Sequence, residues 1–315
     1  MKKSITFFLF IIIFATAIES FPQNQQPNQT VQAEGNKSGN VALRFSIMNK
    51  KTWRFVDGLK KENFSIYEDD VKQEITEFRQ IEQPLSVILL LDVSGSMRSH
   101  VETMKDAAQE VLQHLNPKDL IALMTFREDT NLVADFTNDK QIIKSKIDDL
   151  VCARTTSLEQ AFHFASQHMR KAASADSRHV IIAITDDLTK EFDKSHPIKE
   201  VLRELNESGS VVYGLIVPRP EIKESIFRRT EIKIVSETYV KETGGRVLPL
   251  ADKNARAKIS GILENLQNQY SLAYVSTKMK PGGKPPKIKV KTSPDVEKRE
   301  GDVEMFTGPS LMNMQ

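Results

Sequence analysis

The chain has 315 residues, with 44 basic and 42 acidic side chains and a formal net charge of +2. This length allows one large core and one smaller domain, and the balanced charge shows no overall preference for nucleic acid or an anionic membrane surface. The single cysteine, Cys152, excludes an intramolecular disulfide framework and a metal site built from several thiolates.

The first twenty residues have the pattern of a secretory signal. Lys2 and Lys3 supply the positive charge, Phe7–Phe14 is an unbroken apolar run, and residues 15–17 are small enough for cleavage. The apolar run is shorter than the ~20 residues that a membrane span needs, so we interpret 1–20 as a signal peptide. We therefore expect a secreted, periplasmic or cell-surface protein without a membrane span once the signal is removed.

Residues 21–40 are rich in Gln, Asn and Pro and predict a disordered linker. The N-terminal β segment, residues 41–83, then alternates apolar and polar side chains over 41–48, 63–70 and 74–81. Such alternation indicates three short strands. A fragment of this size cannot bury a core by itself, so it needs a partner from elsewhere in the chain.

Residues 84–250 alternate between predicted strands and predicted helices. This order favours an α/β fold with a doubly wound, mostly parallel sheet. Leu85–Leu91 is apolar except at Ser86, as expected for a strand that is buried on both faces. The expected strands are 85–91, 120–126, 131–136, 180–185, 211–217 and 247–250, and the expected helices are 101–115, 142–150, 158–172, 198–205 and 235–243.

The C-terminal segment, residues 251–315, predicts a helix and a β-hairpin. The helix is expected over 254–267, and the hairpin strands over 270–275 and 287–292, around a turn at 281–283. We expect this segment to pair with 41–83 in one smaller antiparallel β domain. Its lysines have no aromatic residues between them, so stacking on single-stranded nucleic acid is not supported.

Three oxygen-bearing side chains follow the apolar strand 85–91. Asp92, Ser94 and Ser96 lie on the predicted turn at its carboxyl end, which is where open α/β sheets place ligands. Carboxylate and hydroxyl oxygens suit Mg²⁺, Mn²⁺ or Ca²⁺, and no cluster of His or Cys favours zinc. The alternate spacing on a turn lets the three groups converge on one cation.

This D-x-S-x-S pattern resembles the metal-ion-dependent adhesion site of von Willebrand factor type A domains. Thr156 in ARTTSLEQAF and Asp186 in VIIAITDD stand at the positions that complete the family motif, with Thr155 as an alternative to its neighbour. The resemblance covers about residues 84–250 and implies a six-stranded sheet with one short antiparallel edge strand. With the flanking segments, residues 41–308 also resemble the bacterial VWFA-related family.

The resemblance implies a division of roles. Ser94 and Ser96 would bind the cation directly, Thr156 directly or through water, and Asp92 and Asp186 largely through water and hydrogen bonds. A cation held by neutral oxygens keeps most of its charge and would take an Asp or Glu of a protein ligand at its open position. This implies an exported, non-enzymatic binding or adhesion protein.

Two departures from the family pattern and two alternative functions remain open. Asp187 stands where type A domains commonly have Gly, and Arg154 stands where a Gly usually precedes the Thr. One alternative is a metal-dependent hydrolase, such as a phosphoesterase with Asp92 as nucleophile; Ser94 then occupies the place of the second acid that such sites usually have. The other is a scaffold whose cation only braces the loops.

Overall fold

The computed structural model describes residues 33–35, 40–152, 157–187, 194–218, 235–276, 278 and 286–306. The predicted signal peptide lies outside these residues, as do most of the predicted linker and the predicted turn at 281–283.

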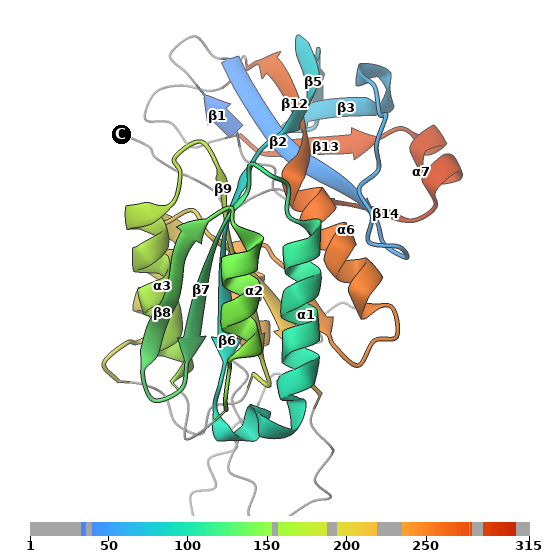
Figure 1. Cartoon of the computed structure of the whole chain (residues 1–315). Coiled ribbons are helices and arrows are strands. Elements are labelled where there is room, and N and C mark those ends of the chain that lie inside the picture. The colour runs from blue at the N-terminus through green and yellow to red at the C-terminus, as the bar shows by residue number, and fades with distance from the viewer. Residues whose placement is uncertain are drawn as a thin grey trace, which may run out of the picture.

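A six-stranded sheet forms the centre of the larger part of the molecule (Figure 1). Its strand order is β11-β10-β9-β6-β7-β8; β8 is antiparallel to β7, and every other neighbouring pair is parallel. The sheet confirms the predicted doubly wound fold and its antiparallel edge strand. Its strands are β6 (Leu85–Asp92), β7 (Leu120–Phe126), β8 (Thr130–Thr137), β9 (Arg178–Thr185), β10 (Val211–Ile216) and β11 (Val247–Pro249).

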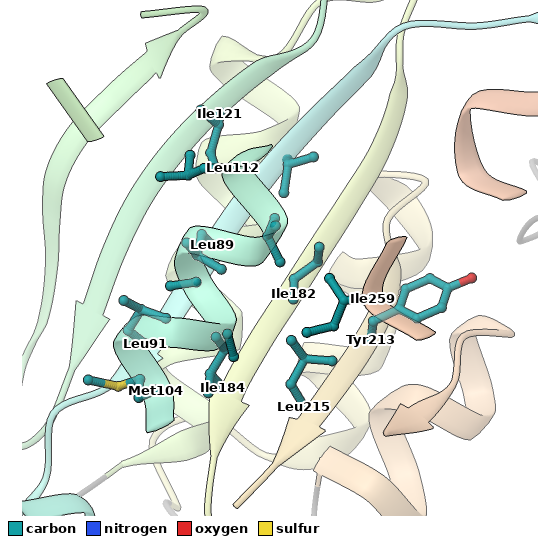
Figure 2. Packing of buried hydrophobic residues seen from close by; sticks show 14 of the residues in the cluster. Leu89, Leu91, Met104, Leu112, Ile121, Ile182, Ile184, Tyr213, Leu215 and Ile259 are labelled. Carbon is teal, nitrogen blue, oxygen red and sulfur yellow. The ribbon is translucent and has the colours of Figure 1, made fainter. Parts of the chain in front are cut away.

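Helices cover both faces of this sheet. Along β6, Leu89 and Leu91 pack with the α1 side, whereas Ile88 and Leu90 pack with the α3 side. Figure 2 shows α1 and α6 side chains lying over the first of these faces. The helices are α1 (Val101–His114), α2 (Lys140–Asp148) and α6 (Ala255–Gln267) on one face, and α3 (Leu158–Ala172), α4 (Ile198–Glu207), the π-helical turn η3 (Val235–Tyr239) and α5 (Val240–Thr243) on the other.

The flanking segments form a second part with two smaller sheets, here called the β body. Its five-stranded sheet has the order β1-β2-β12-β5, with β14 also pairing with β2, and its three-stranded sheet has the order β13-β3-β4. The strands are β1 (Ala33–Gly35), β2 (Asn40–Asn49), β3 (Phe64–Glu68), β4 (Val71–Gln73), β5 (Glu77–Glu82), β12 (Asn268–Val275), β13 (Ile288–Thr292) and β14 (Val303–Phe306); the helices are η1 (Lys61–Asn63) and α7 (Pro294–Glu300).

Strands from the two ends of the sequence share one core in the β body. The C-terminal strand β12 lies between β2 and β5, so Leu272 stands opposite both Leu43 and Phe78. Tyr270 is fully buried, and its ring stacks on Phe55 and on Phe78. Neither segment could close this core alone, which explains why each reads as an unpartnered fragment.

Two expectations for the flanking segments are wrong, and two elements were not expected. The predicted C-terminal hairpin does not form, because β12 and β13 lie in different sheets and each pairs with N-terminal strands. Residues 33–35 of the predicted disordered linker form β1, which pairs with β2. Helix α7 and strand β14 were not expected; α7 is seven residues long and has one buried residue, Val296, so it has no apolar periodicity to detect.

The β body and the larger part are joined by a continuous element and by aromatic contacts, including those of Trp53. Helix α6 leads into β12 without a loop. Trp53, in a turn after β2, has a left-handed backbone (φ 62°), and its ring carries the Arg246 guanidinium at 5.0 Å and the Lys258 ammonium at 4.8 Å. A Cβ on Gly261 of α6 would lie 2.3 Å from the Trp53 carbonyl oxygen, so this approach requires glycine. No helix among the described residues combines the length and the apolar character of a membrane span.

Candidate metal centre

Four of the predicted metal residues, Asp92, Ser94, Ser96 and Asp186, lie at the end of the molecule opposite the β body. The 3-10 helix η2 (Gly95–His100) follows β6 after two residues and leads into α1. It lies at the foot of the sheet in Figure 1, whereas the β body lies at the top. Strands β6 and β9 are parallel neighbours, so Asp92, at the end of the first, and Asp186, just after the second, meet at the same edge.

Asp92 is fully buried, and both of its carboxylate oxygens accept hydrogen bonds. Oδ1 accepts from the Ser94 backbone N–H at 3.0 Å, and Oδ2 accepts from the Thr185 hydroxyl at 2.6 Å. Thr185 was not predicted as a site residue, although it is the hydroxyl residue directly before Asp186. These two bonds fix the orientation of the carboxylate on the turn.

The serine hydroxyls of the motif lie side by side. Ser94 Oγ and Ser96 Oγ are 3.0 Å apart, with Ser94 buried and Ser96 exposed. One hydroxyl oxygen of this pair therefore lies in the interior and the other at the surface of the sheet edge, where a ligand can contact it.

Two buried carboxyl groups, those of Asp92 and Asp186, lie at this edge of the sheet. Burial raises the pKa of Asp92 to about 6; hydrogen bonds from Ser94 and Thr185 oppose that shift, and the charge of Asp186 adds to it. Asp186 itself is only 5% exposed. A cation between these groups would offset the cost of burying both charges.

The oxygen donors thus fit a hard divalent cation. Within the described part of the chain, no group of three or more His, Cys, Asp or Glu side chains is placed to hold a metal, so the candidate centre consists of two carboxylates combined with hydroxyls. This is a donor set for Mg²⁺, Mn²⁺ or Ca²⁺, and a poor one for softer ions.

Comparison with known protein families identifies the domain that contains this sheet edge. Residues 87–188 match the family model of the von Willebrand factor type A domain, a range that spans Asp92, both serines and Asp186. The chain contains a von Willebrand factor type A domain. Curated protein sequences gave no match.

Several solved structures are similar to this chain. The hypothetical protein BatB from Bacteroides thetaiotaomicron is 19% identical, with 57% of this chain and 96% of that chain covered and a TM-score of 0.45. An aerotolerance-related membrane protein from Bacteroides fragilis is 18% identical, covering 58% and 98% of the two chains, with a TM-score of 0.45. A von Willebrand factor type A protein from Catenulispora acidiphila is 11% identical, covering 83% and 72%, with a TM-score of 0.48.

Asp187, the first departure from the type A pattern, has a backbone conformation that favours Gly. Its φ is +54°, in the left-handed region where Gly is favoured and Asp is tolerated. Its amide donates to the Thr185 hydroxyl at 3.0 Å, and its carboxylate Oδ1 accepts from the Val235 backbone N–H at 2.7 Å. One Asp187 oxygen is thus committed to holding the start of η3 at the metal edge of the type A domain.

Of the loop that carries the threonine of the type A motif, the structure describes the end at Ser157 and not the threonine itself. Thr156, its alternative Thr155 and Arg154 lie outside the described residues. The next residue, Ser157, donates its backbone N–H to the carbonyl of Arg127 at 2.9 Å, just beyond the end of β7. The threonine loop therefore ends beside the same sheet edge that carries Asp92.

Proposed function

We propose that this protein is an exported, non-enzymatic binding protein whose type A domain recognises a protein ligand through a divalent cation. Type A domains are generally binding modules without catalytic activity. The observation that carries the proposal is the pairing of two buried carboxyl groups, Asp92 and Asp186, with the adjacent hydroxyls of Ser94 and Ser96.

The cation would be held by Ser94, Ser96 and Thr156, with Asp92 and Asp186 bracing it. Bound Mg²⁺, or Mn²⁺ or Ca²⁺ in its place, supplies a positive centre that attracts an Asp or Glu carboxylate of the ligand. The protein's own contribution is preorganisation: Thr185 and the Ser94 amide fix Asp92 before any cation arrives. Recognition of this kind breaks no covalent bond.

The environment of Asp92 argues against the hydrolase alternative. A carboxylate nucleophile needs an exposed oxygen in reach of its substrate. Asp92 is 0% exposed, and both of its oxygens are engaged by hydrogen bonds.

Export is supported by the charged and apolar start of the chain, including Lys2, Lys3 and Phe7–Phe14.

Cation binding tests the proposal directly, without the ligand. We expect Mg²⁺ or Mn²⁺ to bind in isothermal titration and to raise the melting temperature, since a ligand at 100 times its Kd stabilises the fold by about 2.7 kcal/mol. Asp92→Ala and Ser96→Ala should each weaken cation binding at least about tenfold. Ser99→Ala, which removes another exposed hydroxyl of η2, is the matched control and should bind as the wild type does.

Ligand capture is then measured with and without chelator. Surface proteins retained in Mg²⁺ and released by EDTA, with no retention by Asp92→Ala, would support the adhesion function. Retention that is indifferent to EDTA would favour the scaffold alternative. Cation affinity unchanged in Asp92→Ala would overturn the proposed centre, and turnover of generic phosphoesters would favour the hydrolase.

A further inference from the structure

A buried glutamate lies at the start of the helix that follows the threonine loop. Glu159 is in the first turn of α3 and is only 1% exposed. Just before this helix, the backbone N–H of Ser157 bonds to the Arg127 carbonyl beyond the end of β7, so α3 begins at the metal edge. Glutamate is almost never fully buried unless its charge is paired. The position of Glu159 therefore points to a positive charge at this edge.

Helix geometry directs the Glu159 side chain toward the same edge. Side chains of an α-helix lean back toward the N-terminus of the helix. The N-terminus of α3 adjoins the end of β7, where Phe126 stands opposite Asp92 of β6. The Glu159 carboxylate therefore joins Asp92 and Asp186 as a buried acid at this end of the sheet.

Tyr239, the last residue of η3, packs against the first turns of α3. Its ring contacts the ring of Phe162, three residues after Glu159, with the ring centroids 4.6 Å apart. Tyr239 is fully buried, and its hydroxyl has no hydrogen-bond partner among the described residues. Burial raises the pKa of Tyr239, and the charge of Glu159 raises it further, as expected for a hydroxyl close to that carboxylate.

The π-helical turn η3 also begins at the metal edge. The N–H of Val235, its first residue, bonds to Asp187 Oδ1 at 2.7 Å. The Tyr239 side chain leans back toward Val235, just as Glu159 leans back toward the start of α3. A buried hydroxyl without a partner costs free energy unless a polar group reaches it, and a water ligand of a cation is such a group.

We propose that Glu159 and Tyr239 form the inner wall of the cation centre and position the cation through its water ligands. This inference rests on the proposed function, because it concerns the same cation. Mg²⁺ usually keeps several water ligands, and losing a group that supports the ligands of a metal typically costs about 10- to 100-fold in affinity. Both are positioning residues: Glu159 would accept hydrogen bonds from water and Tyr239 would supply its unused hydroxyl. The charge of the bound cation would offset the cost of burying Glu159.

The test is Mg²⁺ titration of the full chain by calorimetry, together with melting temperatures measured in EDTA. Glu159→Gln should bind Mg²⁺ at least about tenfold more weakly than the wild type. In EDTA this variant should melt at or above the wild-type temperature, because it removes one of several buried like charges. Tyr239→Phe should lose Mg²⁺ affinity by a smaller factor, since a hydroxyl carries no charge.

Two matched controls separate this role from general effects. Glu102→Gln removes an exposed first-turn glutamate of α1, which also begins at the metal edge. Tyr213→Phe removes a buried tyrosine hydroxyl on the opposite face of the sheet. Both controls should bind Mg²⁺ as the wild type does.

The outcomes distinguish this inference from the proposed function. Wild-type Mg²⁺ affinity in folded Glu159→Gln, with a loss in Asp92→Ala, would overturn this inference alone. A lower melting temperature of Glu159→Gln in EDTA at unchanged Mg²⁺ affinity would do the same, because it would show a purely structural role. Absence of Mg²⁺ binding by the wild type would overturn the proposed function and this inference with it.

Discussion

The two ends of this molecule use buried groups in opposite ways. At the metal edge the buried side chains include carboxyls and hydroxyls, and burial of Asp92 beside Asp186 works against their charges. In the β body the core is apolar and aromatic, centred on Tyr270 among Phe45, Phe64 and Phe78. Burial at the first end therefore works against stability, whereas burial at the second end holds together segments that are distant in sequence.

Removing the centre of the aromatic core should have the largest effect on stability. Tyr270→Ala deletes a fully buried ring that stacks on Phe55 and Phe78, and its hydroxyl donates to the Val56 carbonyl at 2.7 Å. We expect a loss of about 3–5 kcal/mol in the free energy of unfolding. Tyr67→Ala, on the half-exposed face of β3, is the matched control and should cost about 1 kcal/mol, the value of its contact with Lys291.

The same variant tests whether the two ends unfold together. Trp53 is the single tryptophan and lies at the junction, in contact with Lys258 of α6. Unfolding can be followed by the fluorescence of Trp53 and by far-ultraviolet circular dichroism. The midpoints of the two transitions should shift by the same amount in Tyr270→Ala, because α6 continues into β12. A fluorescence transition that moves while the helical signal stays in place would show two independent units.

Substitutions at Asp187 sharpen the comparison at the metal edge, with an intermediate effect. Asp187→Ala loses the hydrogen bond to the Val235 N–H and places Ala at φ +54°, which together should cost about 1–3 kcal/mol. Asp187→Asn keeps the acceptor and tolerates the left-handed backbone, so its stability should stay near that of the wild type. Thermal unfolding measures both.

Cation titration of the same pair separates Asp187 from its neighbour. Asp187→Asn should bind Mg²⁺ as the wild type does, because the Asp187 carboxylate is committed to the start of η3. Asp186→Asn should bind the cation more weakly. Equal losses in the two variants would mean that Asp187 also serves the cation, and that the departure from Gly has changed the centre.

The contrast also explains which features could be predicted from the sequence. The type A domain consists of strands and helices whose periodicity lies within single stretches, so Leu85–Leu91 and Leu158–Ala172 were predicted within about one residue of β6 and α3. The D-x-S-x-S turn is equally local. Its hydrogen-bond partner Thr185 is distant in sequence, and only the register of β6 with β9 brings it to Asp92.

The β body could not be predicted in the same way, because its pairing is long-range. The strand segments were visible as alternating residues, but alternation does not name a partner. The turn at 281–283 favoured a hairpin between neighbours, whereas β13 pairs with β3, placing Val290 opposite Ile66. Short elements such as β4 (Val71–Gln73) contain too few residues to show any period.

The smallest predicted effect concerns the acidic turn that joins β3 to β4. Asp69 and Asp70 both have left-handed backbones, with φ of 45° and 66°, and form the two-residue loop of this hairpin. The Lys287 backbone N–H, which donates to Asp69, is the main cause that lowers the pKa of that carboxyl, and Lys278 adds to it. These contacts connect β3 to the C-terminal strand.

A lowered pKa in the folded state fixes the sign of the pH dependence. The Asp69 carboxylate stabilises the β body above its ordinary pKa of 3.8, and this contribution is lost as the pH falls through the lower, folded value. Asp69→Asn should therefore be slightly less stable than the wild type at pH 6, with the gap closing toward pH 2. Asp129→Asn, at an exposed loop, is the control for general acid effects. If the difference in stability between Asp69→Asn and the wild type stayed the same at low pH, the role of Asp69 would be explained by turn geometry and by no charge interaction.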